Sequence, residues 1–198
     1  MNAAVILAAG ESRRMGRAKA LLGLNGVTFL EHIINAVRSA AIDNVLVAVA
    51  HDDPKILKIC ELHGVYVIHN TATPVAVPLG SIQAAVSQVI NQSVESLLVW
   101  PVDQPHVRPS TASGLLTAFL RFQKAVTVPV FGGRRGHPVV FGRSVFDELL
   151  AAPPDLGARA VVRADPGRVC EVAVDDPAVL DDIDTPADYE ALLARFRP

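Results

Sequence analysis

Cysteine is scarce in this chain of 198 residues, which contains only Cys60 and Cys170. The two lie far apart and form no C-x-x-C pair, so the sequence offers neither a zinc ribbon nor a dithiol redox motif. Apolar neighbours favour buried, reduced thiols at both positions. The six histidines show no metal-binding spacing such as H-x-x-x-H. These absences exclude the common cysteine and histidine metal motifs.

A strong charge of one sign is also lacking, because 18 basic and 20 acidic residues give a formal net charge of −2. Bulk electrostatics therefore gives no reason to expect a nucleic acid or an anionic membrane as a partner. The first apolar run, residues 3–9, is too short to span a bilayer, and no cleavage signal follows it. We expect a cytoplasmic protein with a hydrophobic core.

A glycine-containing cationic loop follows that apolar run. The run stops at Gly10, Ser12 comes next, and the loop holds four basic residues: Arg13, Arg14, Arg17 and Lys19. This pattern predicts a buried strand that brings backbone N–H groups and cations to one end of a sheet, where they would bind phosphate oxygens. Five residues separate Gly10 from Gly16, so the spacing fits neither a P-loop nor the G-x-G-x-x-G motif.

Predicted strands and helices alternate along the chain, which indicates a mostly parallel sheet covered on both faces. We expect a single α/β domain of the three-layer, Rossmann-like kind, with one antiparallel excursion near residues 125–141. The predicted strands are residues 3–9, 45–50, 65–68, 97–102, 125–131, 139–141 and 168–174. Helices are predicted to begin at Thr28, Asp53, Ser81, Ser110, Ser144 and Thr185, and residues 70–81 are expected to form a loop.

Two aspartates stand where a ligand site of such a sheet would lie. Asp103 directly follows the strand predicted at 97–102, and ligands of open α/β sheets bind outside the carboxyl ends of the strands. An aspartate that caps a turn is the alternative. Asp184 precedes Thr185, whose pattern is that of a helix N-cap, and this helix start leaves Asp184 unexplained. Asp182 either points the same way or caps the turn.

A glycine-rich turn, Gly132-Gly-Arg-Arg-Gly-His-Pro138, joins two of the predicted strands. It would place Arg134, Arg135 and His137 beside a backbone that a ligand can approach closely, because glycine has no Cβ atom. A solvated turn is the simpler alternative.

Separately spaced elements along nearly the whole chain resemble the nucleotidyltransferases related to molybdenum cofactor cytidylyltransferase and guanylyltransferase. Residues 7–19 meet every specified position of the pattern L-A-A-G-x-S-x-R-M-G-x-x-K. Residues 103–105 match the strand-D-x-P motif, and residues 182–186 match D-I-D-T-P. Residues 135–138 resemble the R-G-H-P segment of the cytidylyltransferase branch. Residues 154–160 echo its G-D-x-G-A-R element, with Pro154 in place of the first glycine and Arg159 kept.

The resemblance implies a specific role for each of the candidate site residues. Asp103 and Asp184 would bind Mg²⁺, while Arg14 and Lys19 would neutralise the triphosphate. Arg135 and His137 would lie near a pterin acceptor. Residues 1–105 would form a nucleotide-binding half and residues 106–198 an acceptor-binding half. The other residues expected to contact the nucleotide are Leu7, Ala8, Ala9, Gly10, Ser12, Gly80 and Ser81.

The reaction implied is transfer of CMP from CTP to the phosphate of molybdopterin-bound molybdenum, with release of pyrophosphate. Ala9 supports CTP, because the guanylyltransferases have Leu-Ala-Gly-Gly where this chain has Leu-Ala-Ala-Gly. A molybdoenzyme of the xanthine dehydrogenase type is the further partner that the resemblance suggests. The alternatives are a GTP-dependent or sugar-phosphate nucleotidyltransferase, a non-catalytic protein that delivers nucleotide or cofactor, and a relative that has moved to oxidoreductase chemistry.

Overall fold

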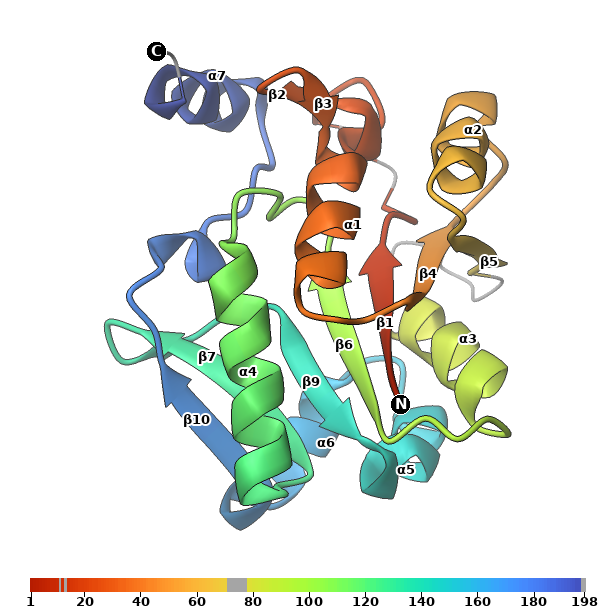
Figure 1. The fold of residues 1–198 in the computed structure, drawn as a ribbon, viewed down its shortest axis with the longest axis vertical. Coiled ribbons are helices and arrows are strands. Elements are labelled where there is room, and N and C mark those ends of the chain that lie inside the picture. Colours follow the sequence, from red (N-terminus) through yellow and green to blue (C-terminus); the bar gives the residue numbers. More distant parts are fainter. Residues whose placement is uncertain (11, 13, 71–77, 197–198) are drawn as a thin grey trace.

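The computed structural model describes residues 1–10, 12, 14–70 and 78–196. Its main sheet has the strand order β10-β7-β9-β6-β1-β4-β5, and β8 pairs with β7 (Figure 1). These strands are β1 (Asn2–Leu7), β4 (Asn44–Val49), β5 (Tyr66–His69), β6 (Ser96–Pro101), β7 (Val126–Phe131), β8 (Arg134–Arg135), β9 (Val139–Gly142) and β10 (Val169–Ala173). A separate hairpin joins β2 (Gly23–Leu24) to β3 (Val27–Thr28).

The sheet is mostly parallel, and β9 is its main exception. β1 pairs in parallel with β4 and β6, β4 pairs in parallel with β5, and β7 with β10. β9 runs antiparallel between β6 and β7. The predicted antiparallel excursion is therefore an inner strand of the sheet, and its first residues lie at the edge where the parallel strands end.

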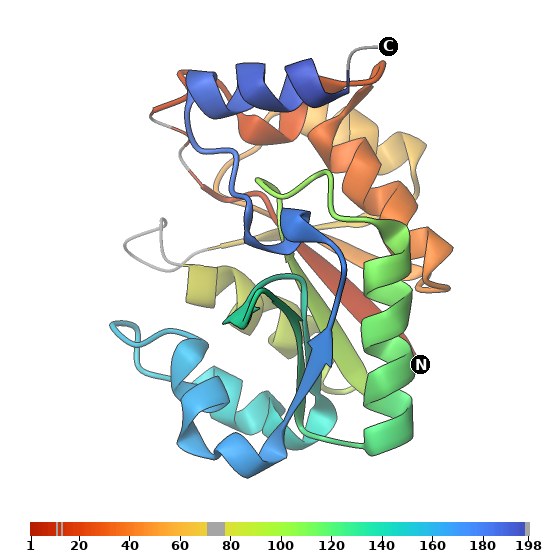
Figure 2. The same cartoon turned by 90° about the vertical axis from the view of Figure 1, so that its left-hand side faces the viewer.

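Helices cover both faces of the sheet and make a three-layer molecule (Figure 2). The described residues form α1 (Phe29–Ser39), α2 (Pro54–Leu62), α3 (Pro78–Val89), α4 (Pro109–Phe122), α5 (Phe146–Ala151), α6 (Arg159–Ala164) and α7 (Pro186–Arg195). One core cluster joins the sheet to α1, α2 and α4, and the other joins it to α3, α5 and α6. Along β1, Ile6 packs in the first cluster and Val5 in the second, because successive strand residues point to opposite faces.

Local sequence signals set several helix starts. Thr28 and Glu31 form a reciprocal capping box at α1, and Thr185 and Asp188 form another at α7. Helix α3 begins at Pro78, inside the segment 70–81 that we expected to be a loop, because proline suits the first turn of a helix. The rest of that expected loop, residues 71–77, lies outside the described residues.

Both cysteines are unpaired. Cys60 lies on the buried face of α2, and this burial raises the pKa of its thiol to about 11. Cys170 lies on β10 and is only partly buried, so the expectation of a buried thiol holds for Cys60 alone. In the described part of the chain, none of the helices combines the length and the apolar character that crossing a bilayer requires.

Candidate active site

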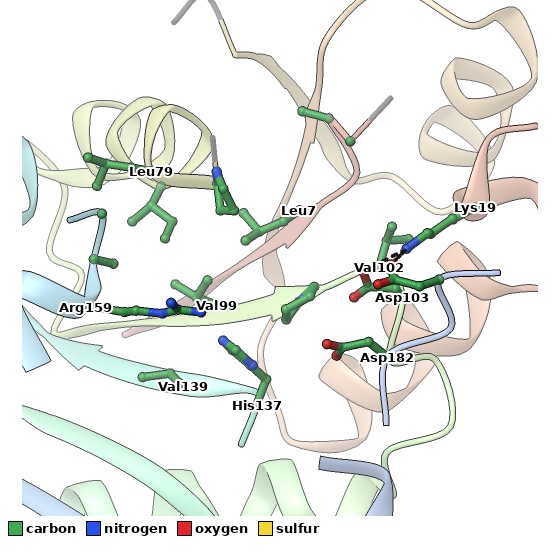
Figure 3. Close-up of a pocket in the computed structure, with 18 of the residues that line it drawn as sticks. Leu7, Lys19, Leu79, Val99, Val102, Asp103, His137, Val139, Arg159 and Asp182 are labelled. Atoms are coloured by element: carbon green, nitrogen blue, oxygen red, sulfur yellow. Dashed lines mark hydrogen bonds and ion pairs between the residues drawn. The ribbon is translucent and has the colours of Figure 1, made fainter. Parts of the chain in front are cut away.

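A cavity of about 630 Å³ opens at the carboxyl ends of β1 and β6. The loop after β1, the start of α3, the start of β9, the segment before α6 and the segment before α7 all contribute to its wall (Figure 3). Cavities of a few hundred to a thousand cubic ångströms hold drug-sized ligands. The place is also the one expected for ligands of an open α/β sheet.

One end of this cavity holds a cluster of cations and carboxylates. The Lys19 Nζ atom lies 3.0 Å from Asp103 Oδ2 and 2.5 Å from Asp184 Oδ1. The Arg14 guanidinium lies 2.9 Å from Asp184 Oδ2. The structure thus brings together the four residues to which the sequence assigns catalysis and metal binding, although Asp184 follows Lys19 by 165 positions.

The charges in this cluster support one another. Burial works against the Lys19 ammonium, but Asp103 and Asp184 outweigh that effect and raise its pKa above the ordinary value. The hydrogen bond from Lys19 holds the pKa of Asp184 below its usual range, and Arg14 adds to the effect. Both ion-pair partners are therefore charged at neutral pH.

Two structural links place the carboxylates side by side. Asp103 lies two residues after the end of β6, and its carbonyl accepts a hydrogen bond of 2.9 Å from the Ile183 amide. The Asp184 amide in turn donates to Asp188, the acidic member of the α7 capping box. The helix start therefore fixes the backbone of Asp184, while its carboxylate turns towards Lys19.

The cavity wall after β1 contains part of the set of residues that the sequence predicts to contact a nucleotide. Leu7, Ala9, Gly10 and Ser12 line the wall. Ala8 does not line it; this residue packs against the core, and its amide donates to the Ala48 carbonyl.

Helix α3 contributes different residues from those expected. Gly80 and Ser81 lie in its first turn, but both are buried and neither lines the cavity. Leu79 and Ile82 line it instead, because neighbouring helical positions point in different directions.

On the opposite wall of the cavity, only one of the two residues predicted to lie near an acceptor is present. His137 lines the cavity, but Arg135 lies outside it, where its Nε atom is 2.7 Å from Glu171 of β10. Arg135 pairs with Val130 in the β7–β8 ladder, and the alternation of side chains along a strand sends it away from the cavity. Arg159 lines this wall; the sequence identified it only as a retained motif position and gave no signal of its direction.

Asp182 is a third carboxylate in the cavity wall. The Gln104 side-chain amide donates to its Oδ1 atom over 2.7 Å, which fixes its orientation. Burial raises the pKa of Asp182, and the nearby Asp103 carboxylate raises it further. Of the two interpretations given to Asp182 from sequence, the structure supports the one in which it faces the same cavity as Asp184.

The donor set at Asp103 and Asp184 fits a divalent cation that a substrate helps to bind. Their carboxylate oxygens converge on one cationic atom, Lys19 Nζ. Among the residues that the structure describes, no group of three or more His, Cys, Asp or Glu side chains could hold a metal by itself. Mg²⁺ is commonly bound by one or two carboxylates, with phosphate oxygens and water completing the shell.

Comparison with known proteins agrees with this geometry. A molybdenum cofactor guanylyltransferase of Rhizobium meliloti (strain 1021) is 35% identical over 117 residues, 58% of this chain and about half (51%) of the relative's length. One from Acidiphilium cryptum (strain JF-5) is 30% identical over 202 residues, 95% of this chain and 92% of that relative.

Solved structures show the same fold. Rv0371c of Mycobacterium tuberculosis H37Rv superposes with a TM-score of 0.83 at 28% identity, over 98% of both chains. A manganese complex of Rv0371c gives a TM-score of 0.76 at 27% identity, over 97% of both chains. The model of the MobA-like NTP transferase domain matches residues 4–169. The chain therefore belongs to the MobA-like NTP transferase domain family.

Proposed function

We propose that this nucleotidyltransferase transfers CMP from CTP to the terminal phosphate of a molybdopterin-type cofactor, with Mg²⁺ and with release of pyrophosphate. The observation that carries the proposal is the cluster of Arg14, Lys19, Asp103 and Asp184 at one end of a cavity of about 630 Å³. This cluster combines cations for a triphosphate with carboxylates for its metal ion, and the remaining cavity can take an acceptor.

The reaction needs no nucleophile from the protein. An oxygen of the acceptor phosphate, already ionised at neutral pH, attacks the α-phosphorus of the nucleotide. A new P–O bond forms while the bond to the β-phosphate breaks, and its electron pair leaves with pyrophosphate. Catalysis then rests on positioning and on charge stabilisation.

Arg14 and Lys19 would bind the phosphates that depart. In the structure both cations contact Asp184. A triphosphate offers them several charged oxygens, and charge-assisted hydrogen bonds to such oxygens are among the strongest that a protein makes. Arg14 is largely exposed and can change partner with little cost in packing, whereas Lys19 acts from a mostly buried position.

Asp103 and Asp184 would hold the Mg²⁺ ion. When bound there, the ion would neutralise charge that develops on the phosphates during transfer. The two carboxylates come from distant parts of the chain, and the Ile183–Asp103 hydrogen bond keeps them together before any substrate binds.

Residues 1–105 would bind the donor and residues 106–198 the acceptor. Leu7, Ala9 and Gly10 would contact the base and the ribose. Ala9 is only 5% exposed, and its methyl group takes up space that a glycine would leave open to a larger base. This is the support for CTP.

GTP is the second candidate, because the relatives reported above are named guanylyltransferases. Pyrophosphate release with each of the four nucleoside triphosphates, in the presence of molybdenum cofactor, separates the two. A clear preference for GTP would overturn the assignment to CTP. A cytoplasmic location and a molybdoenzyme of the xanthine dehydrogenase type as recipient are part of the proposal.

The Asp103→Ala variant tests the mechanism. We expect loss of metal-dependent pyrophosphate release by about 100-fold or more, with the fold retained, because metal ligands act directly on the transferring group. Asp175→Ala is a matched control, since the Asp175 side chain is exposed and lines the shallow groove beside α4 instead of the main cavity. Near-normal activity in Asp103→Ala would place the metal elsewhere.

A further inference from the structure

The cavity has a second positively charged end. Arg14 and Lys19 stand at the carboxylate end, while Arg159, the first residue of α6, extends along the opposite wall (Figure 3). Val99 and Val139 lie in the wall beside Arg159. A ligand that reaches both ends would therefore have charged or polar groups at its two extremities and an apolar surface against its middle.

Among the arginines that the structure describes, Arg159 is unusual because it faces the cavity without a partner from the described part of the chain. Among the described residues it forms no hydrogen bond, ion pair or aromatic contact, whereas Arg14 and Arg135 each form an ion pair. Asp155 also lines the cavity but lies beyond ion-pair distance of Arg159. A guanidinium has five N–H donors in a planar fork that matches paired oxygens. Here those donors remain available to a ligand.

The residue beside Arg159, His137, also suits this end of the cavity to a ligand that carries oxygen atoms. His137 lines the cavity and is exposed to it, but the surrounding protein still desolvates the ring, which lowers its pKa. The Asp182 and Asp103 carboxylates act in the opposite direction, while the positive charge of Arg159 adds to the lowering. His137 is thus neutral at neutral pH, and Arg159 is the charged donor at this end.

We propose that Arg159 binds an oxygen-bearing edge of the acceptor's heterocycle, such as a ring carbonyl, and thereby determines which acceptors are used. This inference rests on the proposed function. Arg159 comes from the acceptor-binding half and shares its wall with His137 and β9, across the cavity from the loop after β1. The reacting phosphate of the acceptor would lie near Lys19, and Arg159 would hold the far end of the molecule.

The test compares Arg159→Met with the wild type in two constants, the KM for the acceptor and the equilibrium Kd for CTP. Loss of a charge-assisted hydrogen bond should raise the KM for the molybdenum cofactor by about 10- to 100-fold. The equilibrium Kd for CTP should stay within about twofold, because the nucleotide lies at the other end. Arg159→Lys should recover part of the loss, since it keeps the charge without the fork.

Arg163→Met is the matched control. Arg163 lies one turn further along the same helix, is exposed and does not line the cavity, so its loss should leave both constants unchanged. An unchanged acceptor KM in Arg159→Met would overturn the proposal. A rise in the Kd for CTP as large as that in the acceptor KM would also overturn it, because Arg159 would then hold the nucleotide base.

Direct binding separates this inference from the proposed reaction. The fluorescent probe 6-hydroxymethylpterin monophosphate carries the ring and a phosphate but needs no turnover to report binding. If wild-type protein released no pyrophosphate, the proposed function would fail, while weaker probe binding by Arg159→Met than by Arg163→Met would still support the site. Equal binding by the two variants, or no binding to the wild type, would overturn the inference.

Discussion

The Lys19 ammonium occupies the position where two carboxylates converge, at 3.0 Å from Asp103 and 2.5 Å from Asp184. A metal ion that entered the nucleotide-free protein would have to share these carboxylates with a fixed positive charge. When phosphates arrive, Lys19 can bind them and leave the carboxylates to the metal. At the scale of single residues, one lysine therefore links metal binding to nucleotide binding.

We predict that Lys19→Met binds Mn²⁺ more tightly than the wild type when no nucleotide is present. Two unit charges 4 Å apart repel by about 4 kcal/mol at an effective dielectric constant of 20, so a gain of tenfold or more is expected. Electron paramagnetic resonance of free Mn²⁺ measures it. Lys124→Met is the control, because Lys124 bonds a carbonyl far from the cavity. Weaker Mn²⁺ binding by Lys19→Met would contradict the prediction that Lys19 and the metal ion compete for the two carboxylates.

The arginines show which side-chain positions the sequence could predict and which it could not. Arg14 could be predicted near the site because it lies in a loop that must leave the end of β1. Arg135 was assigned to the cavity and lies outside it, while Arg159 received no role and lines the wall. The difference depends on strand register and on how a loop packs. A shift of one residue would reverse the direction of every side chain in the strand.

Among the elements, the turn between β7 and β9 is held by a backbone contact that only glycine permits. A Cβ atom on Gly136 would lie 2.1 Å from the Val179 carbonyl oxygen. The adjacent His137 amide donates to that same oxygen over 3.0 Å. This close approach therefore fixes where His137 enters the cavity wall.

We predict that Gly136→Ala lowers the free energy of unfolding by about 1–3 kcal/mol or more, as overpacking of a tight site does. Gly114→Ala is the matched control. Gly114 lies in α4 with open space around its Cβ position, so alanine should raise stability by about 0.5–1 kcal/mol. Urea denaturation of both variants measures the difference. Equal stabilities would mean that the turn can move away from Val179.

Element types were predictable where the signal is local. The capping box at Thr28 and the Asp53–Pro54 helix start are both present in the structure. The position of β9 between β6 and β7 was not predictable, because strand pairing joins segments far apart in the chain. Periodicity identifies a strand, but its neighbours depend on the packing of the whole sheet.

At the scale of the whole molecule, the last described part of the chain packs on the first. Ile183 is fully buried in a small cluster with Leu22, Leu24 and Phe29, and Leu192 of α7 completes it. The cluster stands apart from the two cores on either side of the sheet. It joins the cationic loop to the segment that carries Asp184.

We predict that Ile183→Ala lowers both stability and metal affinity. A large-to-small change at a fully buried position costs about 2–5 kcal/mol. The cavity left behind also frees the neighbouring Asp184, so Mn²⁺ affinity with nucleotide present should fall. Leu149 lies on the buried face of α5 and is equally inaccessible, so Leu149→Ala should lose similar stability and keep its Mn²⁺ affinity. Equal loss of Mn²⁺ affinity in Ile183→Ala and Leu149→Ala would contradict the prediction, because general destabilisation would then explain both losses.

The general architecture followed from alternating strands and helices, and the family resemblance placed the cationic loop and both aspartates within it. The meeting of residues 19 and 184 depends on the small cluster around Ile183. Its apolar residues look like any other core positions in the sequence. Periodicity alone cannot separate this cluster from the two larger ones.

The pairing of Lys19 with Asp184 also sets the order of events during synthesis. The ribosome releases the cationic loop early and the second carboxylate more than 160 residues later. Until then, Lys19 can contact only Asp103 of its two partners, and Leu22, Leu24 and Phe29 lack the cover of Ile183 and Leu192. A nascent chain would therefore contain the cationic loop before the proposed metal site is complete, and competence for the proposed transfer would arise only when α7 docks.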